Sequence, residues 1–94
     1  MDQGGNIEVR MPDHLHAGVY ANNTVFSHTK EEFVIDFMMV APPTGTVTSR
    51  VIVTPAHMKR MFAALKDNIS KYEKAHGKIE AGPAPKQKVG FHPE

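Results

Sequence analysis

Six histidines are the residues of this 94-residue chain best suited to hold a metal ion, because neutral imidazole is the usual ligand where cysteine is absent. Their spacing does not favour a site: no His-Glu-x-x-His motif occurs, and two of them lie near opposite ends of a predicted helix. We therefore predict no metal and no other cofactor, and interpret the set as surface histidines: His14, His16, His28, His57, His76 and His92.

Ser27, Ser49 and Asp36, together with the histidines, supply the residue types of a hydrolase triad. No Gly-x-Ser-x-Gly motif places them together, and the chain has neither a glycine-rich phosphate loop nor a distinctive pair of carboxylates. The sequence therefore predicts a protein that is not an enzyme.

Asp36 is the one charge inside an otherwise apolar segment, where a carboxylate is costly unless it is paired. Arg50 is the natural partner, because a predicted hairpin turn at residues 42–45 brings its strand alongside. We expect a structural ion pair between them; a functional role for the carboxylate is the alternative.

The strand at residues 33–40 positions Asp36 and is apolar on both alternating faces, so it has no solvent side. One helix can cover one face, and the other then packs against a second copy or another protein. We predict that the interface includes Phe33, Val34, Ile35, Phe37, Met38, Met39 and Val40.

A long helix is predicted from Pro55, with Thr54 as its N-cap and Gly77 as its stop. Apolar residues recur along it at spacings of three and four: Met58, Met61, Phe62, Leu65, Ile69, Tyr72 and His76. A basic face remains, which could contact nucleic-acid phosphates through Lys59, Arg60, Lys66, Lys71 and Lys74.

The remaining elements complete an α+β domain over residues 7–79. Strands are predicted at residues 7–11 and at residues 19–27, the second with a bulge at its two central asparagines, and a fourth at residues 46–53. The fold predicted is a four-stranded antiparallel sheet followed by one long C-terminal helix packed on it. Residues 1–6 and 80–94 read as disordered ends.

Composition limits the setting of this domain. The chain has no cysteine, no signal-peptide pattern and no apolar stretch long enough to span a bilayer, which favours a cytoplasmic protein without a membrane partner. A domain of this size buries only about 60–65% of its unfolded surface, so association with a second copy would add needed burial.

Four motifs follow one another through the domain: Val19-Tyr20-Ala21-Asn22, then Glu32-Phe33-Val34-Ile35-Asp36-Phe37, then Ser49-Arg50-Val51-Ile52-Val53-Thr54-Pro55, then Tyr72-Glu73 with Gly77-Lys78-Ile79. Together they resemble a family of short prokaryotic proteins catalogued as a domain of unknown function, a resemblance that implies no activity and no site residues. The element order is also similar to that of the SecB export chaperones, which implies dimers or tetramers and raises the expectation of peptide binding.

These observations predict a non-enzymatic, homo-oligomeric protein-binding module, chaperone-like in that flexible methionines can adapt to varied apolar segments. The dimer or tetramer would form around the strand at residues 33–40. The alternative is a nucleic-acid-binding protein that uses the basic helix face.

Overall fold

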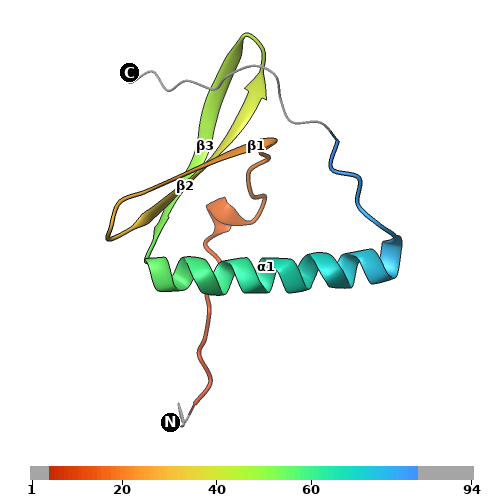
Figure 1. Ribbon diagram of the computed structural model, residues 1–94. Helices are drawn as coiled ribbons and strands as arrows, with labels where there is room; N and C mark the ends of the chain where they lie inside the picture. The colour runs from red at the N-terminus through yellow and green to blue at the C-terminus, as the bar shows by residue number, and fades with distance from the viewer. Residues whose placement is uncertain (1–4, 83–94) are drawn as a thin grey trace. The chain divides into compact units, whose positions relative to one another are not determined.

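The computed structural model describes residues 5–82 as an α+β chain (Figure 1). A short 3₁₀ turn, η1 (Asp13–Leu15), precedes the strands β1 (Asn23–His28), β2 (Phe33–Ala41) and β3 (Thr44–Val53), and the helix α1 (Pro55–His76) follows them. The predicted class is confirmed: an antiparallel sheet followed by one C-terminal helix. Within residues 5–82, however, the sheet has three strands, and the predicted fourth is not shown. Most of the predicted disordered ends, residues 1–4 and 83–94, lies outside the described residues.

The sheet order is β1-β2-β3, with both neighbours antiparallel to β2. The predicted hairpin between β2 and β3 is confirmed, and Pro42 and Pro43 alone form its turn. In the register of this sheet, Ile35 lies between Phe26 and Val51. Paired residues share a face and successive residues alternate, so Ile35 and Asp36 lie on opposite faces of the sheet.

The predicted first strand at residues 7–11 is not shown in the described chain. The segment has no strand structure, and Ile7 and Val9 are 85% and 89% exposed. Its alternation of apolar and polar residues suits a sheet, but no strand of the described chain pairs with it. A periodic pattern predicts which side chains a strand would bury. The strand forms only if a neighbouring strand pairs with its backbone.

The predicted second strand begins four residues later than expected, at Asn23, and the predicted bulge at Asn22 and Asn23 is replaced by side-chain pairing. The Asn22 side-chain amide donates to the Val40 carbonyl oxygen over 3.0 Å, and its Oδ1 accepts from the Val40 N–H over 2.8 Å. Asn22 therefore satisfies with its side chain the two Val40 groups that a longer β1 would have paired through its backbone.

A bulge does occur, in β3. Phe37 pairs with Ser49 while Met38 pairs with Val47, so Thr48 is an extra residue on β3, and its hydroxyl donates to the Phe37 carbonyl oxygen over 3.2 Å. Strict alternation along β3 would place Val47 on the same face as Ser49. The extra residue instead places Val47 on the face that carries Asp36.

The core of the sheet is small and centred on β2. Among the described apolar residues, only Ile35 and Met38 are fully buried, one on each face. Asp36 is equally buried, at 1% exposure. The prediction that β2 has no solvent-facing side therefore holds at its centre, whereas the flanking strands leave large apolar side chains open.

The predicted ends of α1 are confirmed. The Thr54 hydroxyl accepts a hydrogen bond from the His57 N–H over 3.1 Å, which is the pattern of an N-cap. At the other end Gly77 adopts φ +95°, and the Glu73 carboxylate accepts from the Ile79 N–H over 2.9 Å.

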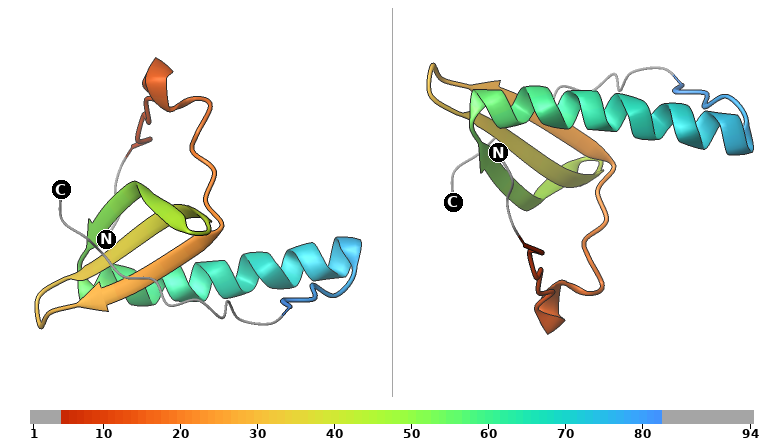
Figure 2. Two further views of the ribbon diagram at one scale, coloured as in Figure 1. Left: turned by 90° about the horizontal axis from the view of Figure 1, so that it is seen from above. Right: turned by 90° about the horizontal axis from the view of Figure 1, so that it is seen from below.

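The helix between these ends is one continuous ribbon (Figure 2). None of its residues is fully buried, and its packing on the sheet stays a prediction. Within residues 5–82 no helix has the length and apolar character needed to cross a membrane.

Candidate interaction surfaces

Asp36 and Arg50 face each other directly across β2 and β3, and the structure pairs them. Arg50 Nε donates to Asp36 Oδ1 over 2.6 Å, and Nη2 donates to Oδ2 over 3.0 Å. Two parallel donors on two carboxylate oxygens form the planar, bidentate arrangement in which arginine binds carboxylates best. The pair thus satisfies the buried carboxylate without help from another chain.

Hydrogen bonding sets the ionisation of this pair. The hydrogen bonds from Arg50 lower the pKa of Asp36 below its ordinary value, its burial acts in the opposite direction, and the positive charge of Arg50 lowers it further. The same contact raises the pKa of Arg50. The carboxylate therefore stays ionised and engaged near neutral pH, unlike a poised proton acceptor.

The Arg50 side chain is 59% exposed although its partner is buried. Apolar residues share this face of the sheet. Val25 in β1 pairs with Asp36, and Val47 and Ile52 lie in β3 on either side of Arg50. Ile52 and Val47 are exposed. This face therefore presents an arginine head group among apolar side chains, a composition enriched at protein interfaces.

The predicted interface residues of β2 divide into three groups. Ile35 and Met38 are buried within the chain, and Phe33, Val34, Phe37 and Val40 are partly buried. Met39 is exposed. The more open apolar side chains lie on the flanking strands instead, at Phe26, Val51 and Ile52, because a central strand is covered by its neighbours while edge strands are not.

The triad residue types are not assembled around Asp36. Ser49 pairs with Phe37, so it lies on the face opposite to Asp36, and the two Arg50 hydrogen bonds already engage the carboxylate. Ser27 lies in β1, opposite Val34. Within residues 5–82, these contacts do not join a serine, a histidine and Asp36 in the order that acyl transfer requires.

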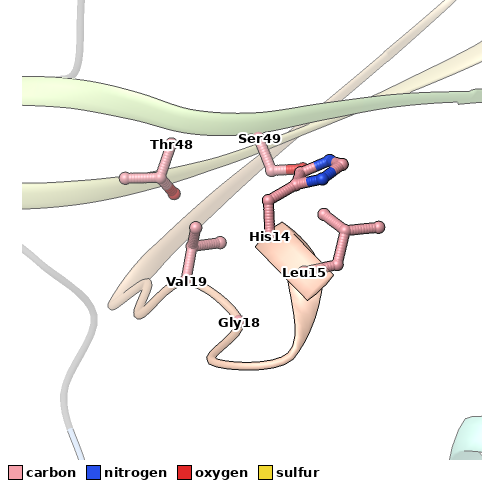
Figure 3. A pocket seen from close by; sticks show the side chains of 6 residues that line it. All are labelled: His14, Leu15, Gly18, Val19, Thr48 and Ser49. Atoms are coloured by element: carbon pink, nitrogen blue, oxygen red, sulfur yellow. The ribbon is translucent and has the colours of Figure 1, made fainter. Parts of the chain in front are cut away.

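Ser49 instead lines a small hollow beside η1, together with His14, Leu15, Gly18, Val19 and Thr48. The His14 ring points toward Ser49 in this hollow (Figure 3). Its volume is about 180 Å³, below the roughly 300–1,000 Å³ of ordinary ligand pockets. The hollow is too small to enclose a typical small-molecule substrate.

The described histidines form no metal-binding cluster. In the described part of the chain, no three side chains of the metal-binding types lie close enough to hold an ion. The tilted rings of His28 and Phe33 have centroids 5.4 Å apart, and the ring centroids of His76 and Tyr72 are 4.9 Å apart. His16 contacts the Met11 carbonyl oxygen over 3.1 Å. His92 lies outside the described residues.

The predicted basic residues do gather on one side of α1. At about 100° per residue, they fall within an arc of roughly 140°, and that arc points away from the apolar stripe. Its members are Lys59, Arg60, Lys66, Lys71 and Lys74. Lys71 also pairs with Asp67 over 3.1 Å, which lowers the net charge of the face.

The apolar stripe of α1 is open as well. Phe62, Leu65, Ile69 and Tyr72 are 65%, 61%, 42% and 50% exposed. The sequence predicts this stripe, and its packing on the sheet stays a prediction.

Comparison with known proteins identifies a family. Residues 1–81 match the model of the family described as Protein of unknown function (DUF3467). The chain belongs to this family. The resemblance seen in the sequence motifs is thereby confirmed, since the matched range includes all of them. No curated protein and no solved structure matches the chain.

Proposed function

We propose that this DUF3467 member is a non-enzymatic, homo-oligomeric protein-binding module that works in the cytoplasm. One observation carries the proposal: the described chain buries two apolar side chains fully, while Phe26, Ile52, Phe62 and Leu65 are each more than half exposed. Phe62 and Leu65 are neighbours in the apolar stripe of α1, and a contiguous exposed apolar patch of this kind marks contact with other proteins.

A second copy is the occupant that the chain itself suggests. Within residues 5–82, the segment at residues 7–11 has the alternation of a half-buried strand but pairs with no strand, and β1 and β3 each pair on only one side. Addition of this segment to the sheet of another copy would supply the fourth strand that the sequence predicts. Strand addition of this kind satisfies backbone groups on both partners at once.

Binding of other proteins would use the same apolar surfaces. Met39 and Met11 are exposed, and Met58 and Met61 are partly buried in α1. Methionine side chains repack around different apolar segments, which suits a chaperone-like role with varied clients.

The test is the solution mass of the protein, measured by light scattering during size exclusion at several concentrations and at low and high salt. We expect a dimer or tetramer that high salt does not dissociate. Ile52→Asp should dissociate it, and Thr46→Asp, at another exposed position of the same strand, should not. A monomer at all concentrations would refute the proposal.

The basic arc of α1 supports a second candidate, binding of nucleic acid. Lysine and arginine on one face can neutralise several phosphates, and the resulting affinity falls steeply as salt rises. A labelled single-stranded and a labelled double-stranded oligonucleotide, titrated at 50 and 200 mM salt, test this candidate. Salt-insensitive binding, or none, would reject it, whereas binding of an unfolded apolar peptide should change little with salt.

A further inference from the structure

We propose that α1 pairs with α1 of a second copy as an antiparallel two-helix coil, with the two-fold axis level with Asp67. This inference rests on the proposed self-association and specifies one of its surfaces. The helix is described here by itself, from the spacing, exposure and charge of its own residues.

The spacing of the stripe is the first argument. Its inner residues are separated by four, three, four, three and four positions, the repeat of a coiled-coil seam: Met58, Phe62, Leu65, Ile69, Tyr72 and His76. Met61 and the small Ala75 add apolar surface at one flank. A helix that packs on a broad sheet ordinarily carries a wider apolar face, whereas a narrow seam fits a single facing helix.

The symmetry of the stripe is the second argument. The second helix runs antiparallel to the first, with Asp67 of both helices at the axis. A residue that precedes Asp67 by a given number of positions in one helix then faces the residue that follows Asp67 by the same number in the other. Leu65 then meets Ile69, and Phe62 meets Tyr72. Every seam residue meets another seam residue, as a two-fold interface between identical chains requires.

The flanking charges select the direction. In an antiparallel pair, residues at one flank face the same flank of the partner helix, which brings Lys59 beside Glu73 twice, once on each side of the axis. Lys66 faces its own copy, the one repulsive contact. In a parallel pair each flank faces the other flank, which consists of Met61, Asn68 and Ala75, so no opposite charges meet.

The exposure of the stripe agrees with this arrangement. Phe62, Leu65, Ile69 and Tyr72 form its four central residues, and all are open in the chain. The helix extends about 33 Å, long enough for three heptads. Such a short coil adds to the stability of an assembly, and the sheet contacts would contribute the remainder.

Spin labels test the geometry, because the chain has no native cysteine to label by accident. Single Arg60→Cys, Asp67→Cys and Lys74→Cys variants place the label at three positions seven residues apart, all on the outer side of the proposed coil. Antiparallel pairing predicts the shortest label-to-label distance at 67. At 60 and at 74 the two labels should be offset by about 21 Å along the helix axis, from a rise of ~1.5 Å per residue.

Three equal distances would indicate a parallel pair and overturn the proposal. Absence of coupling between labels in a protein whose mass is still that of a dimer would also overturn it, while leaving the proposed self-association intact. A monomeric mass for the unlabelled protein would instead refute self-association itself. Leu65→Asp supplies a second measurement: it should remove the coupling at 67, and Ala64→Asp, on the outer side of the coil, should preserve it.

Discussion

Ile35 and Ile52 are the same residue type in neighbouring strands, but Ile35 is fully buried and Ile52 is 54% exposed. We expect Ile35→Ala to lower the free energy of unfolding by about 2–5 kcal/mol, the usual cost of truncating a buried isoleucine. That is a large fraction of the total for a domain of this size, for which ~0.05–0.15 kcal/mol per residue is typical. If the chain stood alone, Ile52→Ala would cost only about 1 kcal/mol, because half of its side chain is already in water.

Self-association changes the second expectation. If a second copy covers Ile52, the cost of Ile52→Ala approaches that of Ile35→Ala and grows smaller on dilution, as dissociation of the assembly contributes to unfolding. Urea unfolding followed by circular dichroism, at two protein concentrations tenfold or more apart, measures both variants. A cost below ~1 kcal/mol for Ile35→Ala would refute the description of β2 as the core. A small, concentration-independent cost for Ile52→Ala would count against burial of this side chain by another copy.

Three further changes test individual contacts. Because Arg50 lowers the pKa of folded Asp36, the stability from this pair is present above the unfolded pKa near ~3.9 and is lost as pH falls toward the lower folded value; Asp36→Asn should therefore flatten the fall in urea stability below pH 4, and an unchanged slope would refute this linkage. Thr54→Ala should lower the free energy of unfolding by about 1 kcal/mol in thermal or urea unfolding, because the helix cap is lost. Thr54→Ser should retain most of the stability, because its hydroxyl can still cap the helix. Asn22→Ala should raise hydrogen exchange at the Val40 amide by exposing it to water, while an unchanged rate would show that the side-chain contact gives no protection.

Asp67→Asn is the matched control for the pH measurement. Asp67 pairs with Lys71 at the exposed surface of α1, where such pairs contribute little. Its replacement should leave the acid limb of the stability curve unchanged.

Local chemistry made several elements of this chain predictable. The helix could be read from Thr54, Pro55 and Gly77, because capping depends on residues that are adjacent in sequence. The hairpin could be read from its two prolines, and with it the proximity of Asp36 and Arg50, since a short turn restricts the register of the strands that it joins.

Other features depended on contacts that no local pattern contains. The extra residue at Thr48 reverses the face of Val47, and its only mark in the sequence is a threonine among other β-formers. The side-chain pairing of Asn22 requires knowing that Val40 lies opposite. The strand pattern at residues 7–11 was recognised, but its partner strand is not present in the described chain.

The sequence predicted that the chain has apolar interaction surfaces, but it did not predict which apolar residues are exposed. Apolar side chains on both faces of β2 indicated that each face packs against another part of the protein or a second copy. Ile35 and Met38 are in fact buried within the chain itself. Burial of a central strand by its neighbours cannot be read from that strand alone. The open positions fall on Phe26 and Ile52 because edge strands lose that cover.

The bulge at Thr48 has a consequence for the solubility of the protein. β3 is ten residues long and carries exposed valine and isoleucine side chains, and in the described chain it pairs only with β2. A flat apolar edge strand of this length can pair with the edge strands of further copies, and repeated pairing of this kind produces fibrils. An extra residue near its middle twists the strand and interrupts the regular row of backbone donors and acceptors. The same residue that redirects Val47 therefore limits open-ended growth from this edge, and favours closed assemblies of defined size.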